Sequence, residues 1–138
     1  MASVLDEMTT YLAAQGVGTV GTDLFAGLLP DTPDACVALL ETGGMPAAHT
    51  VGGGGAGSAV FERPSIQVIC RGAKHDYAAA RAKAGTAFTK LDGLANTTLS
   101  GTRYLSIFAA QPPFLIGRDE NERPLVGFNV EVAKELSA

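Results

Sequence analysis

A strand pattern that runs directly into a helix pattern is the feature that most constrains this chain. In the stretch PSIQVICRG, the side chains of Ile66, Val68 and Cys70 fall on one side, and polar side chains fall mostly on the other. Alternation with a period of two predicts a half-buried strand. Pro64 is placed at the first position of this strand, where a missing N–H is tolerated. Gly72 then ends the strand.

The helix pattern follows over residues 74–91, which read KHDYAAARAKAGTAFTKL. Apolar residues recur there at the spacing of one helix face. Many of them are alanines, so this helix can approach a sheet closely. The residues on this face are Tyr77, Ala80, Ala84, Ala87, Phe88 and Leu91.

The remaining patterns give strands in consecutive groups and one more helix. Ser3 and Asp6 predict a capping box that opens a helix over residues 3–15, which ends at Gly16. Further predictions are a short extended piece at 23–25, a strand at 36–41 ended by GGMP at 43–46, a turn at 96–101, a strand at 103–111, extended structure at 114–117, a strand at 126–132 and a frayed end at 133–138.

This order of elements predicts an α+β fold, with a mixed, mainly antiparallel β-sheet and two main helices packed on it. The length of 138 residues favours a single domain over residues 1–138. For the strand at 103–111, alternation places Leu105, Ile107 and Ala109 on one face. It places Tyr104 and Phe108 on the opposite face.

Composition excludes several classes of function. The chain is 46% apolar and 17% charged, as in globular proteins, and its net charge is −4. With no run of Lys or Arg, it lacks the basic surface of a nucleic-acid binder. Its apolar runs are too short for a membrane span, so no membrane partner is expected. The N-terminal segment MASVLDEMTTYL lacks the basic region of a secretion signal.

Residues able to carry chemistry occur without the partners that chemistry needs. Cys36 and Cys70 lie in apolar, strand-like segments, so we interpret both as buried thiols rather than as a disulfide. His49 and His75 have no second ligand at metal spacing. No Ser, His or carboxylate arrangement matches a hydrolase signature. We therefore expect no catalytic residue, no metal site and no cofactor, and the chain is not predicted to be an enzyme.

The segment VGGGGAGSA is the least ordered by composition. Its glycines, which include Gly52, Gly53, Gly54 and Gly55, offer little side-chain burial against the entropy cost of ordering. A phosphate-binding loop is not supported, because no Gly-Lys-Ser/Thr follows. We predict a flexible loop at about 47–60. An alternative is a loop that becomes ordered on a neighbouring subunit.

Taken together, the motifs resemble the tail terminator proteins of long-tailed bacteriophages, a family also called minor capsid or tail completion proteins. The resemblance spans nearly the whole chain. It rests on the order and spacing of an N-terminal helix, GTDLFAGLLPDTPDACVALLETGG at 21–44, ERPSIQVICRG at 62–72, KHDYAAARAKA, the strand from Arg103 to Phe108, QPP at 111–113 and LIGRDENERPLVGFNVEV at 115–132.

The resemblance implies a structural role in the virion, in the phage tail or neck. It implies a homo-oligomeric ring, usually a hexamer, at the head-proximal end of the tail tube, which stops tube polymerisation and joins the tail to the head connector. The implied partners are the chain itself, the tail tube protein and the head-tail connector or stopper protein, with genomic DNA only passing through the lumen. Assembly would take place in the cytoplasm of the host bacterium.

A ring of identical subunits needs two different patches that meet head to tail. Candidate patches are the glycines Gly52 to Gly55, the exposed edge of the sheet, and a charged hairpin tip. The tip consists of Arg118, Asp119, Glu120, Glu122 and Arg123, with Asn121 suited to a positive φ.

Two alternatives stay open at the level of sequence. A head-completion or connector protein of the same neck would differ from a terminator only in the partner that it binds. A small ligand-binding or enzymatic domain would instead need a pocket with shifted carboxylate pKa values.

Overall fold

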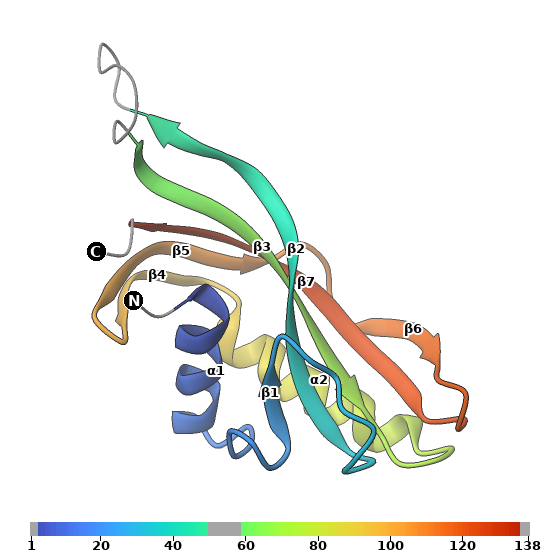
Figure 1. The fold of residues 1–138 in the computed structure, drawn as a ribbon. Coiled ribbons are helices and arrows are strands. Elements are labelled where there is room, and N and C mark those ends of the chain that lie inside the picture. The colour runs from blue at the N-terminus through green and yellow to red at the C-terminus, as the bar shows by residue number, and fades with distance from the viewer. Residues whose placement is uncertain (1–2, 50–58, 136–138) are drawn as a thin grey trace.

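The computed structural model describes residues 3–49 and 59–135, which form a curled seven-stranded sheet and two helices (Figure 1). The strand order is β1-β2-β3-β7-β5-β4, and β6 pairs with β7 outside this path. Among the paired strands of the described residues, only β1 and β2 are parallel, so the predicted α+β class with a mainly antiparallel sheet is confirmed. The elements are α1 (Val4–Ala14), β1 (Leu24–Ala26), β2 (Cys36–His49), β3 (Ala59–Arg71), α2 (Tyr77–Leu91), β4 (Leu94–Leu99), β5 (Thr102–Ala109), β6 (Phe114–Arg118) and β7 (Pro124–Glu135).

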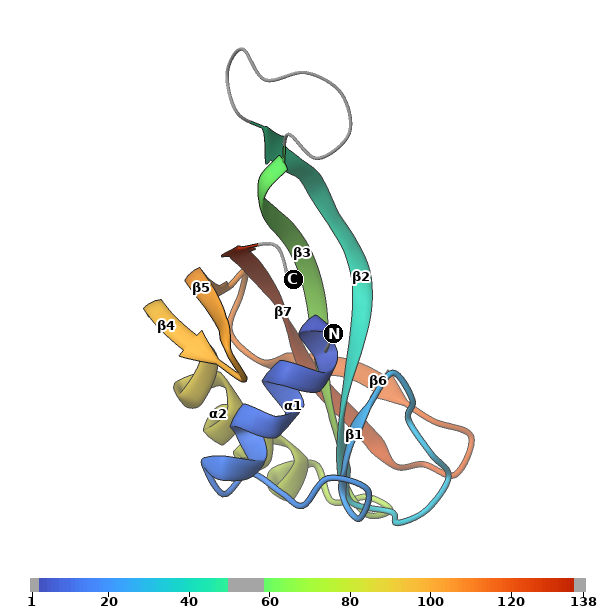
Figure 2. The same cartoon turned by 60° about the vertical axis from the view of Figure 1, so that its left-hand side comes forward.

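The core lies between one face of the sheet and both helices (Figure 2). Alternation selects this face, since Val37, Cys70 and Val126 lie side by side on β2, β3 and β7 and are almost fully buried. The alternation predicted for β7 is confirmed, with Phe128 and Val130 at 0% exposure. The opposite face of the sheet carries no helix of the described residues (Figure 2).

Helix α1 begins where the sequence predicts. The Ser3 hydroxyl accepts a hydrogen bond from the Asp6 N–H at 3.1 Å, and the Asp6 carboxylate accepts one from Ser3 in return. This capping box satisfies N–H groups that the first turn leaves without partners. Met8 and Leu12 then face the core at 0% exposure. The helix is therefore specified locally at its start and by burial along its length.

Helix α2 packs closely because its buried face is made of small residues. Ala80, Ala84 and Ala87 are at most 2% exposed. The helix begins at Tyr77 and not in the preceding KHD segment, because the Asp76 carboxylate caps it and His75 has φ of +63°. Neither helix in the described part of the chain has the length and apolarity that crossing a membrane requires.

The β2–β3 hairpin is longer than predicted. The prediction that GGMP ends the strand was wrong, because β2 continues to His49 and β3 begins at Ala59. Residues 47–49 and 59–60 of the predicted loop therefore belong to strands, and residues 50–58 lie outside the described residues. We call residues 42–49 and 59–64 the arm. Its β3 strand still pairs with β7 at Phe61 and Glu62, and its tip extends past the end of β7 (Figures 1 and 2).

Irregular pairing makes the arm compatible with its sequence. Pro64 lies inside β3, not at its start, and faces Gly44 of β2. A register shift between Glu41 and Gly43 precedes this pair. Bulges of this kind accept a proline that a regular ladder would exclude. Gly44 has φ of +139°, and a Cβ atom there would collide with the Arg63 carbonyl oxygen and Pro64 Cα.

Three other local predictions were wrong. Residues 94–99 form β4, and the turn is confined to Ser100 and Gly101. In β5, Tyr104 and Ile107 are both at 0% exposure, because a register shift between Tyr104 and Ser106 reverses the alternation. The predicted frayed end contributes 133–135 to β7. In contrast, both cysteines are buried and free of disulfide bonds, as predicted.

Candidate assembly interface

The charged turn, residues 118–123 between β6 and β7, is anchored from within the subunit. Arg123 is only 5% exposed. Its Nε lies 2.7 Å from Asp119 Oδ2. Its Nη2 lies 2.9 Å from Asp31 Oδ1, and its Nη1 lies 3.0 Å from Asp34 Oδ1. Arg123 therefore ties the charged turn to the loop that precedes β2.

The charges of this anchor stabilise one another. Desolvation disfavours the ionised Asp119 carboxyl, but hydrogen bonds from Arg123 and Asn121 outweigh it and hold the pKa of Asp119 below its ordinary value. Desolvation also opposes the charge of Arg123, and hydrogen bonds to Asp119, Asp31 and Asp34 outweigh it and raise the pKa of Arg123. Both groups stay charged at neutral pH.

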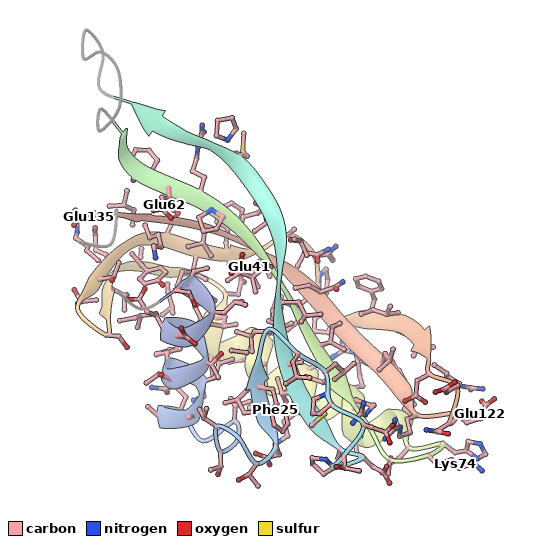
Figure 3. The ribbon with its side chains drawn as sticks, in the orientation of Figure 1. Phe25, Glu41, Glu62, Lys74, Glu122 and Glu135 are labelled. Atoms are coloured by element: carbon pink, nitrogen blue, oxygen red, sulfur yellow. The ribbon has the colours of Figure 1, made fainter. Side chains whose placement is uncertain are left out.

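The other charged side chains of the turn point to solvent. Arg118 Nη1 lies 3.5 Å from Glu122 Oε2, and these side chains are 62% and 52% exposed. Glu120 is exposed as well. The positive φ expected at Asn121 occurs instead at Glu122, at +61°. Glu122 lies at the end of the molecule opposite to Glu62 on the arm (Figure 3).

The predicted glycine patch, Gly52 to Gly55, lies outside the described residues. It follows β2 at the far end of the arm in the sequence. Of the two predicted patches, only the charged turn, which follows β6, is part of the described residues.

Strand β6 exposes three consecutive apolar side chains. Phe114, Leu115 and Ile116 are 42%, 48% and 39% exposed. Neighbouring residues of a strand point to opposite faces, so β6 is apolar on both faces. One side of β6 pairs with β7, and no strand of the described residues pairs with its other side. Unpaired, apolar strand edges are sites where another chain can add.

The open face of the sheet carries a hollow of about 810 Å³ beside the arm. Met45 and Phe108 line it and are 59% and 50% exposed. Ser65 Oγ donates a hydrogen bond to Glu131 Oε2 at 2.7 Å on its floor. The hollow combines exposed apolar side chains with polar groups that already have partners, as a protein-binding surface does.

A buried polar cluster holds α1 to the sheet. Glu7 accepts hydrogen bonds from Thr102 at 2.5 Å and from Tyr104 at 2.7 Å. Lys134 Nζ lies 3.4 Å from Glu7 Oε1. Burial raises the pKa of the Tyr104 hydroxyl, and its hydrogen bond to Glu7 raises it further. These groups satisfy one another and leave no free donor or acceptor aimed at a ligand.

The described residues contain no cluster of His, Cys, Asp and Glu that could hold a metal ion. Burial raises the pKa of both cysteine thiols, which removes their nucleophilic form at neutral pH. The exposed features are a strand edge, a hollow beside an arm, and charges in a turn. These exposed features are of the kind through which polypeptide chains associate.

Residues 11–136 match the family described as bacteriophage tail terminator protein, and the chain belongs to this family. It is a structural phage tail protein associated with the virion. A solved structure of the virion of a native gene transfer agent particle contains a chain of similar fold. The TM-score is 0.60 and the identity 17%, and the alignment covers 97% of this chain and 96% of that one. No curated protein sequence matches the chain.

The charged turn was predicted as a contact patch from its sequence, whereas the extended segment at 114–117 was predicted only as a strand. The available signal was the run Phe114, Leu115 and Ile116 before the turn. Apolar residues at successive positions place apolar side chains on both faces of a strand, and only the structure shows that these faces are exposed.

Proposed function

We propose that this protein forms a homo-oligomeric ring, a hexamer, at the head-proximal end of the tail tube. The ring stops addition of tube protein at one of its faces. Its other face meets the head-tail connector or stopper protein. The observation that carries this proposal is the match to the tail terminator family over residues 11–136.

The surface of the subunit supports self-assembly. A cyclic ring needs two different patches on each subunit. The sheet has free edges on opposite sides, and one of them, β6, is apolar. Arg118, Glu120 and Glu122 of the charged turn are exposed and stay candidate contact residues, together with Gly52 to Gly55.

Genomic DNA is a passing cargo in this proposal. The net charge is −4, so the wall of a lumen would carry few cations to retain phosphates. The ring would be assembled in the host cytoplasm, before the tail joins the filled head.

The test is made on tube assembly. Tube protein is polymerised with and without this chain, and tube length and tube ends are measured by electron microscopy. We expect tubes of uniform length with a ring at one end only when the chain is present. An unrelated acidic protein at the same concentration serves as the control.

Tubes that grow to the same lengths with and without the chain, and that carry no ring, would contradict the proposal. A chain that binds the connector and leaves tube growth unchanged would instead be a head-completion protein.

A further inference from the structure

The free edges of the sheet differ in how well they are protected. Strand β1 has three residues, and the outward peptide groups of Leu24 already bond to Thr19 and Gly21. Strand β4 is polar, and Asn96 interrupts it with φ of +48° and a hydrogen bond from Arg103. Natural sheets protect their edges in these two ways.

Two other stretches of edge have no strand of the described residues beside them, and each contains a register shift, between Leu115 and Gly117 in β6 and between Glu41 and Gly43 in β2. One is β6, with its exposed apolar residues 114–116. The other is the outer side of β2 beyond Leu39, because β1 pairs only with residues 37–39. This second stretch ends at Pro46, which has no N–H to donate. Residues 40–45, which include Gly43 and Gly44 at positive φ, are the stretch left to pair, over a length similar to the five residues of β6.

We propose that β6 of one subunit pairs, antiparallel, with residues 40–45 of β2 in the next subunit. The sheet then continues from one copy of this chain to another around the ring. The inference rests on the proposed ring and names the two edges that close it.

The direction of the strands supports an antiparallel junction. Strands β2, β3, β7 and β6 alternate in direction, because each neighbouring pair among them is antiparallel. An antiparallel β6–β2 junction continues this alternation, so every copy has the same orientation relative to the sheet. Subunits related by rotation about one ring axis must all have this same orientation. Pairing of β6 with β6 would instead relate two copies by a two-fold axis and stop at a dimer.

One exposed side chain of the β2 stretch matches β6 in character, whereas Glu41 and Thr42 are polar and exposed. Met45 on β2 is 59% exposed, and the β6 side chains that it would meet are apolar. Strand β6 pairs with β7 along one side, which leaves its other side to the neighbouring subunit. The junction would cover apolar side chains on both faces of β6, and cross-strand pairs of this kind stabilise sheets.

Paired cysteines test the junction directly. Variants combine Leu115→Cys or Ile116→Cys with Thr42→Cys or Met45→Cys in one chain. Within one subunit, β3 and β7 separate these positions by about three strand spacings of roughly 4.8 Å each, beyond the reach of a disulfide. Oxidation of assembled tails should therefore join subunits, and denaturing gels should show a ladder of multimers up to the closed ring.

The matched control combines Thr42→Cys with Thr98→Cys on the protected edge β4, and it should stay monomeric. The native thiols of Cys36 and Cys70 are buried in every variant. A dimer formed by Ile116→Cys alone would show β6–β6 pairing and overturn the proposal.

A charge on the edge gives a second measurement. Leu115→Lys should abolish the ring on tails, whereas Thr98→Lys on β4 should leave it in place. If tails with Leu115→Lys still carry the ring, the junction alone is overturned. The same holds if none of the four cysteine pairs gives a disulfide ladder on tails that carry the ring. Wild-type tails without a ring overturn the proposed function itself.

Discussion

At the scale of single residues, Glu7 decides how the first helix meets the sheet. It is 2% exposed and pairs with Lys134, which is equally buried. We expect Glu7→Leu to lower the free energy of unfolding by about 3–5 kcal/mol, because it removes the carboxylate of a buried ion pair. Urea unfolding measures this loss.

The double variant Glu7→Leu with Lys134→Met is the control for this prediction. It removes both charges, so it should be more stable than Glu7→Leu alone. Losses of the two single variants that simply add in the double variant would show that the two charges are not coupled.

The buried thiol of Cys70 makes the free energy of unfolding depend on pH in the alkaline range. Burial raises the pKa of its thiol from 9.0 to about 12, a shift that nearby Lys83 opposes. The folded state therefore keeps a proton that the unfolded state releases. The resulting stability is complete below about pH 9 and is lost as pH rises toward about 12.

Urea midpoints at about pH 8 and about pH 10.5 should show this loss, and Cys70→Ala should show a smaller one. Comparison with Cys70→Ala is needed because Tyr104 also has a raised pKa. Equal losses in both proteins would contradict the assignment to Cys70.

At the scale of elements, the arm depends on one glycine. Gly44→Ala places a Cβ atom against the Arg63 carbonyl oxygen and Pro64 Cα, so the two arm strands must separate. We expect faster hydrogen exchange of the arm amides and little change in α2. Gly43→Ala is the matched control, since it also has a positive φ but nothing lies within 4 Å of its added Cβ atom. Equal effects of the two substitutions would show that backbone strain, not the collision, is responsible.

At the scale of the whole molecule, net charge governs contact with DNA. The net charge of −4 gives no attraction to duplex phosphates, and we expect no tight binding of the isolated protein. Fluorescence anisotropy with a labelled duplex of about 20 base pairs, at low and at physiological salt, measures this. Tight binding that weakens with salt would contradict the prediction.

Much of the fold could be predicted from local patterns. The alternation of β3 and β7, the capping box of α1 and the alanine face of α2 each depend on neighbours within one element, and periodicity reports them directly. The buried thiols followed from the same alternation.

The errors came where pairing partners override local preference. The arm extends past Gly43, Gly44 and Pro64 because two irregular stretches face each other across the hairpin. Tyr104 and Ile107 are both buried because a bulge in β5 changes the register against β7. A bulge is a property of two strands, so one strand's sequence does not reveal it.

The sequence alone determined the α+β class, the two helices, the central strands and the resemblance to tail terminators. Each of these rests on periodicity or on the order of motifs along the chain. Only the tertiary structure decided which strand edges are free. It also decided that the Arg123 side chain forms its ion pairs within its own subunit. Strand order and burial arise from contacts between residues far apart in the chain, and no local pattern encodes which edge is left without a partner.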